Sequence, residues 1–141
     1  ENMILTIFPA KKNGVLVGAA VESLTRKGFG GEISIMVGFN ADGSIRNYQV
    51  LKHAETPGLG SKMQEWFRTD KNHQSILGLN PGKGEMKVSK DGGNIDAITA
   101  ATISSRAFID AIQNAYRAFM GEPDVHSAAS PKANQNKEEK K

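Results

Sequence analysis

The sequence predicts an α+β fold in which antiparallel strands pack against a C-terminal helix within a single domain. β-Branched or aromatic residues occupy every second position from Ile33 to Phe39, and a similar segment returns from Ile45 to Leu51, as in a hairpin. Between Ser104 and Met120, apolar residues recur every three or four positions, which is typical of a helix with one buried face. The 141 residues suit one domain with its own hydrophobic core.

The composition indicates a globular chain and excludes several classes of function. Apolar residues make up 38% and charged residues 23%, and the net charge is 18 − 15 = +3. Four lysines and two glutamates in Ser130–Lys141 contribute +2, so the body lacks the basic surface that nucleic acids require. Because cysteine is absent, disulfides, thiolate metal sites and cysteine nucleophiles are excluded. No apolar run approaches the ~18 residues of a membrane span.

The N-terminal part is expected to form strands. Ile4–Phe8 and Val15–Glu22 are rich in apolar and β-branched residues, although the first segment also reads as the end of a helix. The glycines of Gly28–Gly31 interrupt the pattern before the hairpin of Ile33–Leu51. Asn40–Gly43 is expected to form the turn of this hairpin, since Asp-Gly tolerates the positive φ that tight turns need.

The middle of the chain has weaker patterns. His53–Gly60 reads as a loop because it contains proline and glycine, and Ser61 is expected to cap a short helix over Lys62–Phe67. Little periodicity is visible from 69 to 84, so this part is expected to be an irregular segment on the surface. Met86–Ser89 is a candidate short strand.

The C-terminal helix is the best-specified element. Gly121 and Pro123 are expected to end it, and 126–141 is expected to be a disordered charged tail after a globular domain at 1–125. The expected buried stripe consists of Phe108, Ala111, Ile112, Ala115 and Phe119. The expected outward face consists of Arg106, Asp110, Gln113, Asn114 and Arg117.

Small hydroxyl side chains crowd the segment where this helix begins. Thr99, Thr102, Ser104 and Ser105 stand close together beside two alanines. A helix leaves its first amides without partners, and one serine, Ser104 or Ser105, can satisfy them as a cap. The same amides and the positive end of the helix dipole also favour a phosphate. Both interpretations stay open on the pattern alone, although one cap needs one hydroxyl and four are present.

The run Asp96–Ser104, DAITAATIS, resembles the flavinylation motif of the FMN-binding domain family: an Asp, then Ser/Thr-Gly-Ala-Thr and a hydroxyl residue. In that family a dedicated flavin transferase joins FMN, through its phosphate, to the last threonine, which corresponds to Thr102. Asp96 is then a recognition element for the transferase, and Ala100 stands where the family usually has glycine. The resemblance places the rest of the run beside the cofactor: Thr99, Ala100, Ala101, Ile103 and Ser104.

A second segment carries the same resemblance. His53–Gly60, HAETPGLG, is similar to the His-x-Glu-Thr-Pro-Gly-Leu-Gly loop that lies against the flavin in that family. The resemblance runs from about Gly14 to Phe119, which implies that the domain at 1–125 is an FMN-binding domain. It is nearer to the G subunits of Rnf electron-transport complexes than to the C subunits of sodium-pumping NADH:quinone oxidoreductases. Lys90 is expected to place a charge near the flavin. The loop residues expected to contact the cofactor are Glu55, Thr56, Gly58, Leu59 and Gly60.

The resemblance implies an electron-carrier component of a membrane-bound, ion-translocating oxidoreductase, with covalent FMN and no complete active site of its own. Ferredoxin and NAD sites then belong to other subunits. The resemblance also implies that the whole protein has an N-terminal membrane helix, missing from this chain, which is expected to anchor the domain on the extracytoplasmic (periplasmic) side of the cytoplasmic (inner) membrane. The alternatives are the related component of the quinone reductase, a module that binds FMN or another ligand reversibly, and an interaction domain at the membrane surface without a redox role.

Competing motifs are weak. Gly78–Lys83 lacks the spacing and the hydroxyl of a phosphate-binding P-loop, and no Gly-x-Ser-x-Gly elbow of a hydrolase is present. The three histidines, His53, His73 and His126, do not have the spacing of metal ligands.

Overall fold

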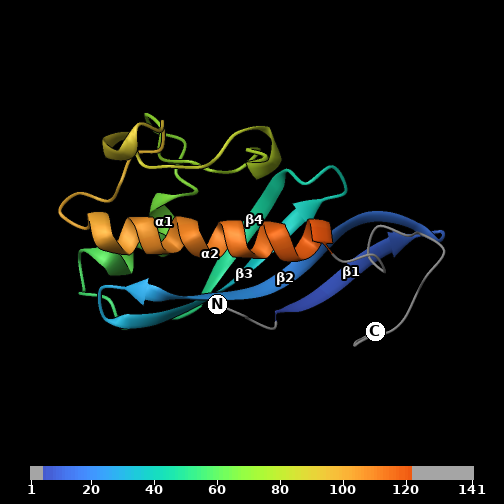
Figure 1. Cartoon of the computed structure of the whole chain (residues 1–141), viewed down its shortest axis with the longest axis horizontal. Helices are drawn as coiled ribbons and strands as arrows, with labels where there is room; N and C mark the ends of the chain where they lie inside the picture. The colour runs from blue at the N-terminus through green and yellow to red at the C-terminus, as the bar shows by residue number, and fades with distance from the viewer. Residues whose placement is uncertain (1–4, 122–141) are drawn as a thin grey trace.

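Four consecutive strands form one antiparallel sheet in the computed structural model, which describes residues 5–121 (Figure 1). The strands lie in the order β1-β2-β3-β4, so each pairs with its neighbour in the chain. Such a meander needs only short turns between strands. The strands are β1 (Thr6–Lys12), β2 (Val15–Gly28), β3 (Gly31–Asn40) and β4 (Ile45–Lys52).

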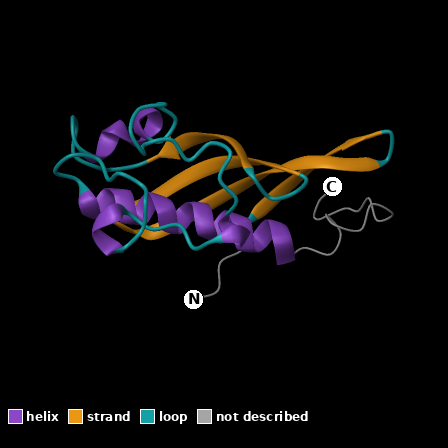
Figure 2. Ribbon diagram, turned by 90° about the horizontal axis from the view of Figure 1, so that it is seen from above, coloured by secondary structure: helices purple, strands orange, loops and turns teal. Residues whose placement is uncertain are grey.

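One long helix, α2 (Thr102–Gly121), lies along a single face of the sheet (Figures 1 and 2). All five residues of the predicted apolar stripe are buried beneath it. Stacked rings join α2 to the sheet and to the connection that follows it. The ring centroids of Phe119 and Phe39 of β3 are 5.2 Å apart, and those of Phe108 and Phe67, which lies after β4, are 4.5 Å apart. The predicted α+β fold, with antiparallel strands packed against a C-terminal helix, is therefore confirmed.

Polar contacts also fasten α2 to β2, and they correct the prediction of a solvated outer face. Ser23 donates from Oγ to the carbonyl oxygen of Ala111 at 2.8 Å, and Thr25 donates to a carboxylate oxygen of Asp110 at 2.8 Å. Only two of the five residues expected to face outward, Arg106 and Arg117, are exposed. The other three are half-buried because they bond to β2 or to the carbonyl of Met86: Asp110, Gln113 and Asn114.

The connection from β4 to α2 has little regular structure and gathers on the β4 side of α2 (Figure 1). Two aromatic residues attach it to the core. Phe67 is fully buried, and the Trp66 indole donates from Nε1 to the carbonyl oxygen of Asp96 at 2.8 Å. The short elements of this connection are the 3-10 helices η1 (Gly60–Lys62), η2 (Pro81–Lys83) and η3 (Ser89–Asp91) and the helix α1 (Met63–Trp66).

The strand expected in the first segment is confirmed as β1, so the alternative of a helix end is excluded. Several other expectations were wrong, since α2 begins two residues before Ser104. Met86–Ser89 forms no strand, because its only ladder contact is an isolated parallel bridge between Val88 and Ile95. Ser61 caps no helix, since its Oγ accepts from the Gly58 amide at 2.9 Å. Gly121 is still helical, whereas Pro123 and the predicted tail at 126–141 lie outside the described residues.

Candidate functional site

A tight turn precedes α2 and sets the position of its first residue. The Ala101 amide donates to the carbonyl oxygen of Ile98 at 2.9 Å, and Ala100 between them has φ of +63°. A positive φ at the third position is the mark of a type II turn, where glycine is favoured. Ser105 bridges the two ends of the turn, because its Oγ accepts from the Ile98 amide and donates to the Ala101 carbonyl, both at 2.9 Å.

Thr102 is the first residue of α2 and is partly exposed. Neither serine of the first turn caps the helix, because Ser105 bonds to the preceding turn and Ser104 to Glu55. Within residues 5–121, the amides of Thr102, Ile103 and Ser104 have no protein acceptor. The start of α2 therefore presents three free N–H groups and a reachable hydroxyl at the positive end of the helix dipole.

Glu55 joins the two sequence motifs. The residue is 5% exposed, and its carboxylate accepts three hydrogen bonds. Oε1 accepts from the Phe29 amide at 2.9 Å and from Ser104 Oγ at 2.5 Å, and Oε2 accepts from the Gly30 amide at 2.9 Å. The β2–β3 turn, the 53–60 loop and the first turn of α2 thus meet at one buried carboxylate.

Two glycines allow these segments to approach. A Cβ at Gly60 would lie 2.4 Å from Ser104 Oγ and 2.7 Å from the Cβ of Glu55. A Cβ at Gly30 would lie 1.9 Å from the carbonyl oxygen of Ala54. Any larger residue would force the segments apart, so the close contact of loop and helix depends on glycine at both positions.

The predicted loop residues form a second turn of the same kind. The Leu59 amide donates to the carbonyl oxygen of Thr56 at 3.0 Å, and Gly58 has φ of +78°, as in a type II turn with Pro57 at its second position. Thr56, Gly58 and Leu59 are exposed. The structure therefore brings Glu55 and Gly60 into contact with the start of α2 and leaves the tip of the loop open to solvent.

Asp96, Thr99 and Lys90 have different surroundings. The Asp96 carboxylate accepts from the His73 amide at 3.2 Å and from Ser89 Oγ at 3.4 Å, so it holds the connecting segments together. Thr99 is exposed at the second position of the 98–101 turn. Lys90 is exposed in η3, which no described hydrogen bond links to the 53–60 loop.

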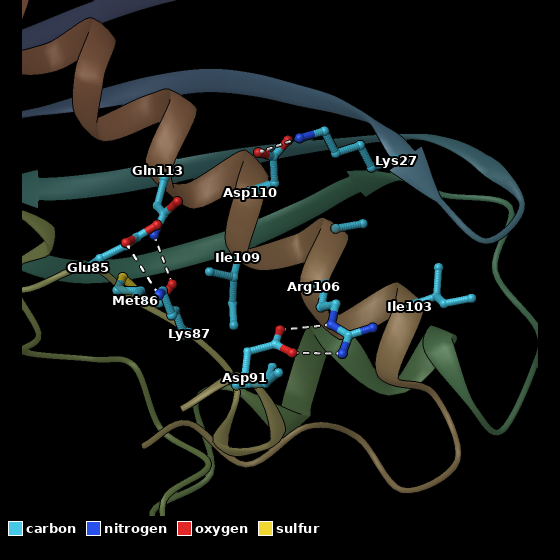
Figure 3. Close-up of a pocket in the computed structure, with 12 residues that line it drawn as sticks. Lys27, Glu85, Met86, Lys87, Asp91, Ile103, Arg106, Ile109, Asp110 and Gln113 are labelled. Carbon is cyan, nitrogen blue, oxygen red and sulfur yellow. Dashed lines mark hydrogen bonds and ion pairs between the residues drawn. The ribbon is translucent and has the colours of Figure 1, made fainter. Parts of the chain in front are cut away.

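The structure shows an ion pair between Arg106 of α2 and Asp91 that the sequence did not predict. Arg106 donates from Nε and Nη2 to the two carboxylate oxygens of Asp91 at 2.8 and 2.7 Å, which attaches η3 to the helix (Figure 3). The guanidinium keeps the pKa of Asp91 below its ordinary value. Arg106 and Asp91 are 15 positions apart, so no local pattern indicates their contact. The same holds for the bonds from Phe29 and Gly30 to Glu55, which span 26 and 25 positions.

The same ion pair lines a groove of about 440 Å³ along α2 (Figure 3). Apolar residues from α2 and from the 85–88 segment form part of it, and each charged side chain shown there faces an opposite charge. Ile103, 50% exposed, lies in its lining, whereas Thr102 and the 53–60 loop do not. The groove therefore reaches the start of α2 at Ile103, and its lining does not include Thr102 or the 53–60 loop.

Comparison with known proteins identifies the class. Residues 28–117 match the model of the FMN-binding domain, so the chain belongs to the FMN-binding domain family. The chain is 39% identical over 114 residues to the G subunit of the ion-translocating oxidoreductase complex of Aliivibrio fischeri (strain MJ11). The match covers 79% of this chain and 53% of the relative.

Two further relatives bear the same name. The protein of Vibrio parahaemolyticus is 40% identical over 118 residues, with 76% of this chain and 51% of the relative covered. The protein of Pseudoalteromonas atlantica is 31% identical over 128 residues, with 88% and 58% covered. The expected resemblance is confirmed, and the chain spans about half the length of the curated relatives it matches. None of the helices in 5–121 is long and apolar enough to cross a membrane.

Proposed function

We propose that FMN is attached through its phosphate to the side-chain oxygen of Thr102. The observation that carries this proposal is the start of α2, where a partly exposed hydroxyl stands beside three amides without protein acceptors in the described chain. Free N–H groups at a helix start bind a phosphate and offset its charge. Membership of the FMN-binding domain family supports flavin as the group that the phosphate carries.

The surrounding residues fit such a group. The phosphate is held by the amides of Thr102, Ile103 and Ser104, and the exposed loop of Thr56–Leu59 provides backbone groups for the polar edge of the ring. Leu59 is 37% exposed and provides an apolar contact for the ring face. Exposed Lys90 is proposed to contribute a positive charge near the flavin. When bound, FMN supplies the capacity to accept and release electrons.

Attachment requires an enzyme. A threonine hydroxyl is a poor nucleophile unless a base or a metal activates it, and no side chain in residues 5–121 accepts a hydrogen bond from Thr102. The flavin transferase is therefore proposed to provide the base. Thr102 Oγ1 forms a bond to phosphorus and loses its proton to that base, while a phosphoanhydride of a flavin dinucleotide breaks and a nucleoside monophosphate leaves.

This placement suits an electron carrier. A covalent bond retains the flavin without a deep pocket and leaves the ring accessible to partner proteins. Given the names of its relatives, we propose that the whole protein is the G-type redox subunit of an ion-translocating complex. The same proposal assigns the ferredoxin and NAD sites to other subunits of the complex. It also includes an N-terminal membrane anchor in the whole protein, which keeps the domain on the extracytoplasmic face.

Co-expression with a flavin transferase tests the attachment. The wild-type chain is expected to give a fluorescent band that survives boiling on a denaturing gel and a mass increase of one FMN less one water. Thr102→Ala is expected to lose both signals and keep the circular dichroism of the fold, because the side chain is partly exposed. Thr99→Ala, the neighbouring hydroxyl, is the matched control and is expected to load.

The other outcomes separate the alternatives. Covalent flavin on the Thr102→Ala protein would show that another residue is the acceptor. Flavin that co-purifies with the wild-type chain but is released on boiling would favour a reversible binding module. If the transferase recognises Asp96, Asp96→Asn is expected to lower the rate of flavin loading. Urea unfolding of the same variant measures how much the bonds of Asp96 to His73 and Ser89 contribute to stability.

A further inference from the structure

We infer that Glu55 is a positioning residue, which fixes the start of α2 and thereby the Thr102 hydroxyl, and is not a ligand of the flavin. This inference rests on the proposed function, since it concerns the presentation of Thr102 to the transferase. It differs from the expectation that Glu55, as part of the 53–60 motif, contacts the cofactor.

The hydrogen-bonding capacity of Glu55 is almost used up. An ionised carboxylate offers about four lone-pair positions, and three donors already occupy Glu55. The whole residue is only 5% exposed, so a ribityl hydroxyl has almost no access to the remaining position. The short 2.5 Å contact with Ser104 and the two amide bonds are charge-assisted, which makes them stronger than neutral hydrogen bonds.

The contacts of Glu55 act on the part of α2 that carries Thr102. Ser104 belongs to the same first helical turn as Thr102. Within residues 5–121, two side chains near the start of α2 bond to distant segments: Ser104 bonds to Glu55, and Arg106 bonds to Asp91. Gly60 packs directly on the Ser104 side chain. A helical turn moves as a unit, so a shift of Ser104 carries the Thr102 oxygen with it.

Thr102 depends on these neighbours for its position. No described side chain holds its hydroxyl, and the Ala100 turn before it is strained by its positive φ. Group transfer requires the attacking oxygen to lie close to phosphorus and in line with the leaving group, and a misplacement of about 1 Å costs up to about a hundredfold in rate. Glu55 therefore acts on the attachment of the flavin through Ser104.

The experiment measures the initial rate of flavin transfer to the purified chain by the transferase, with flavin adenine dinucleotide as donor. Ser104→Ala and Glu55→Gln are each expected to slow the transfer about tenfold. The double variant is expected to be no slower than the slower of the two single variants, because both changes act on the same contact.

Ser23→Ala is the matched control. Ser23 is also a buried serine that bonds α2, but at Ala111, nine positions along the helix from Thr102. It is expected to destabilise the fold as Ser104→Ala does and to load at the wild-type rate. If Ser23→Ala slows the transfer as much as Ser104→Ala, the effect is general instability and the inference is overturned.

Two readouts distinguish positioning from contact with the cofactor. In the loaded Glu55→Gln protein, the midpoint potential and visible spectrum of the flavin are expected to match those of Ser104→Ala. A shift found only in Glu55→Gln would show that Glu55 contacts the flavin. In the unloaded protein, the amide resonances of Thr102 to Ser104 are expected to shift in Glu55→Gln and to stay unchanged in Ser23→Ala.

The proposed function and the inference can fail separately. If the wild-type chain loads on Thr102 and both Glu55→Gln and Ser104→Ala load at its rate, the inference is wrong and the acceptor assignment stands. If the wild-type chain does not load, the acceptor assignment fails, and the amide resonances of the unloaded variants decide whether Glu55 positions the helix start.

Discussion

Replacing Ala100 with glycine is expected to stabilise the protein. Ala100 has φ of +63° at the third position of the 98–101 turn, directly before the helix that begins with the proposed attachment residue. The equivalent position of the 56–59 turn is filled by Gly58, with φ of +78°. The chain thus contains two turns of one type, one with the favoured glycine and one with an alanine whose Cβ crowds the backbone.

The magnitude follows from conformation alone. A left-handed conformation costs alanine about 1–2 kcal/mol relative to its favoured conformations. Glycine avoids this strain but adds about 0.4–1 kcal/mol of unfolded-state entropy. Ala100 is exposed, so little packing changes, and the net gain is about 0.5–1 kcal/mol. For a domain of this size the melting temperature is expected to rise by about 2–6 °C.

Urea unfolding of the isolated chain measures the change, with an unchanged dependence on denaturant as the sign that only stability has altered. Gly58→Ala is the opposite control, because a Cβ there would meet no atom within 4 Å and only the backbone strain remains. It is expected to lose about the free energy that Ala100→Gly gains. A destabilised Ala100→Gly protein, or a neutral Gly58→Ala protein, would refute the assignment of strain to these turns.

Three further predictions concern other parts of the fold. Gly60→Ala is expected to destabilise the protein by about 1–3 kcal/mol in urea, because the new Cβ would overlap Ser104 Oγ at 2.4 Å. Burial raises the pKa of Tyr48 to about 12, so stability should fall as pH rises from about 10 to 12, by on the order of 2–3 kcal/mol. Arg106 lowers the pKa of Asp91. Their ion pair should therefore stabilise the fold at pH values above the ordinary pKa of aspartate, and this stabilisation should be lost as pH falls through the lowered pKa.

Each of these predictions has an outcome that would contradict it. A Gly60→Ala protein as stable as the wild type would show that the loop can withdraw from the helix at no cost. Tyr48→Phe should abolish the alkaline loss measured by phenolate absorbance and unfolding, and a profile unchanged by the substitution would exclude Tyr48 as its cause. Asp91→Asn should flatten the acid side of the melting profile, and an identical profile in both proteins would mean that the exposed pair adds nothing measurable.

The elements with clear periodicity are predictable because their burial pattern is local. The β3–β4 hairpin and α2 each bury one face against the core, and residues of one face recur at fixed intervals in the sequence. The pattern of the preceding strand predicts an end at Glu22, whereas β2 continues to Gly28. Its continuation buries Ser23 and Thr25, polar residues whose partners lie on α2, more than 80 positions away.

The sequence alone predicts the fold class, the family and the hydroxyl proposed to carry FMN, because each depends on patterns within continuous runs of residues. The assembly of the site cannot be read in this way. Glu55 is joined to Ser104 across 49 positions and to Phe29 across 26, and Gly60 matters because of the side chain that it meets. Such contacts depend on the path of the whole chain, so no local pattern in either motif encodes them.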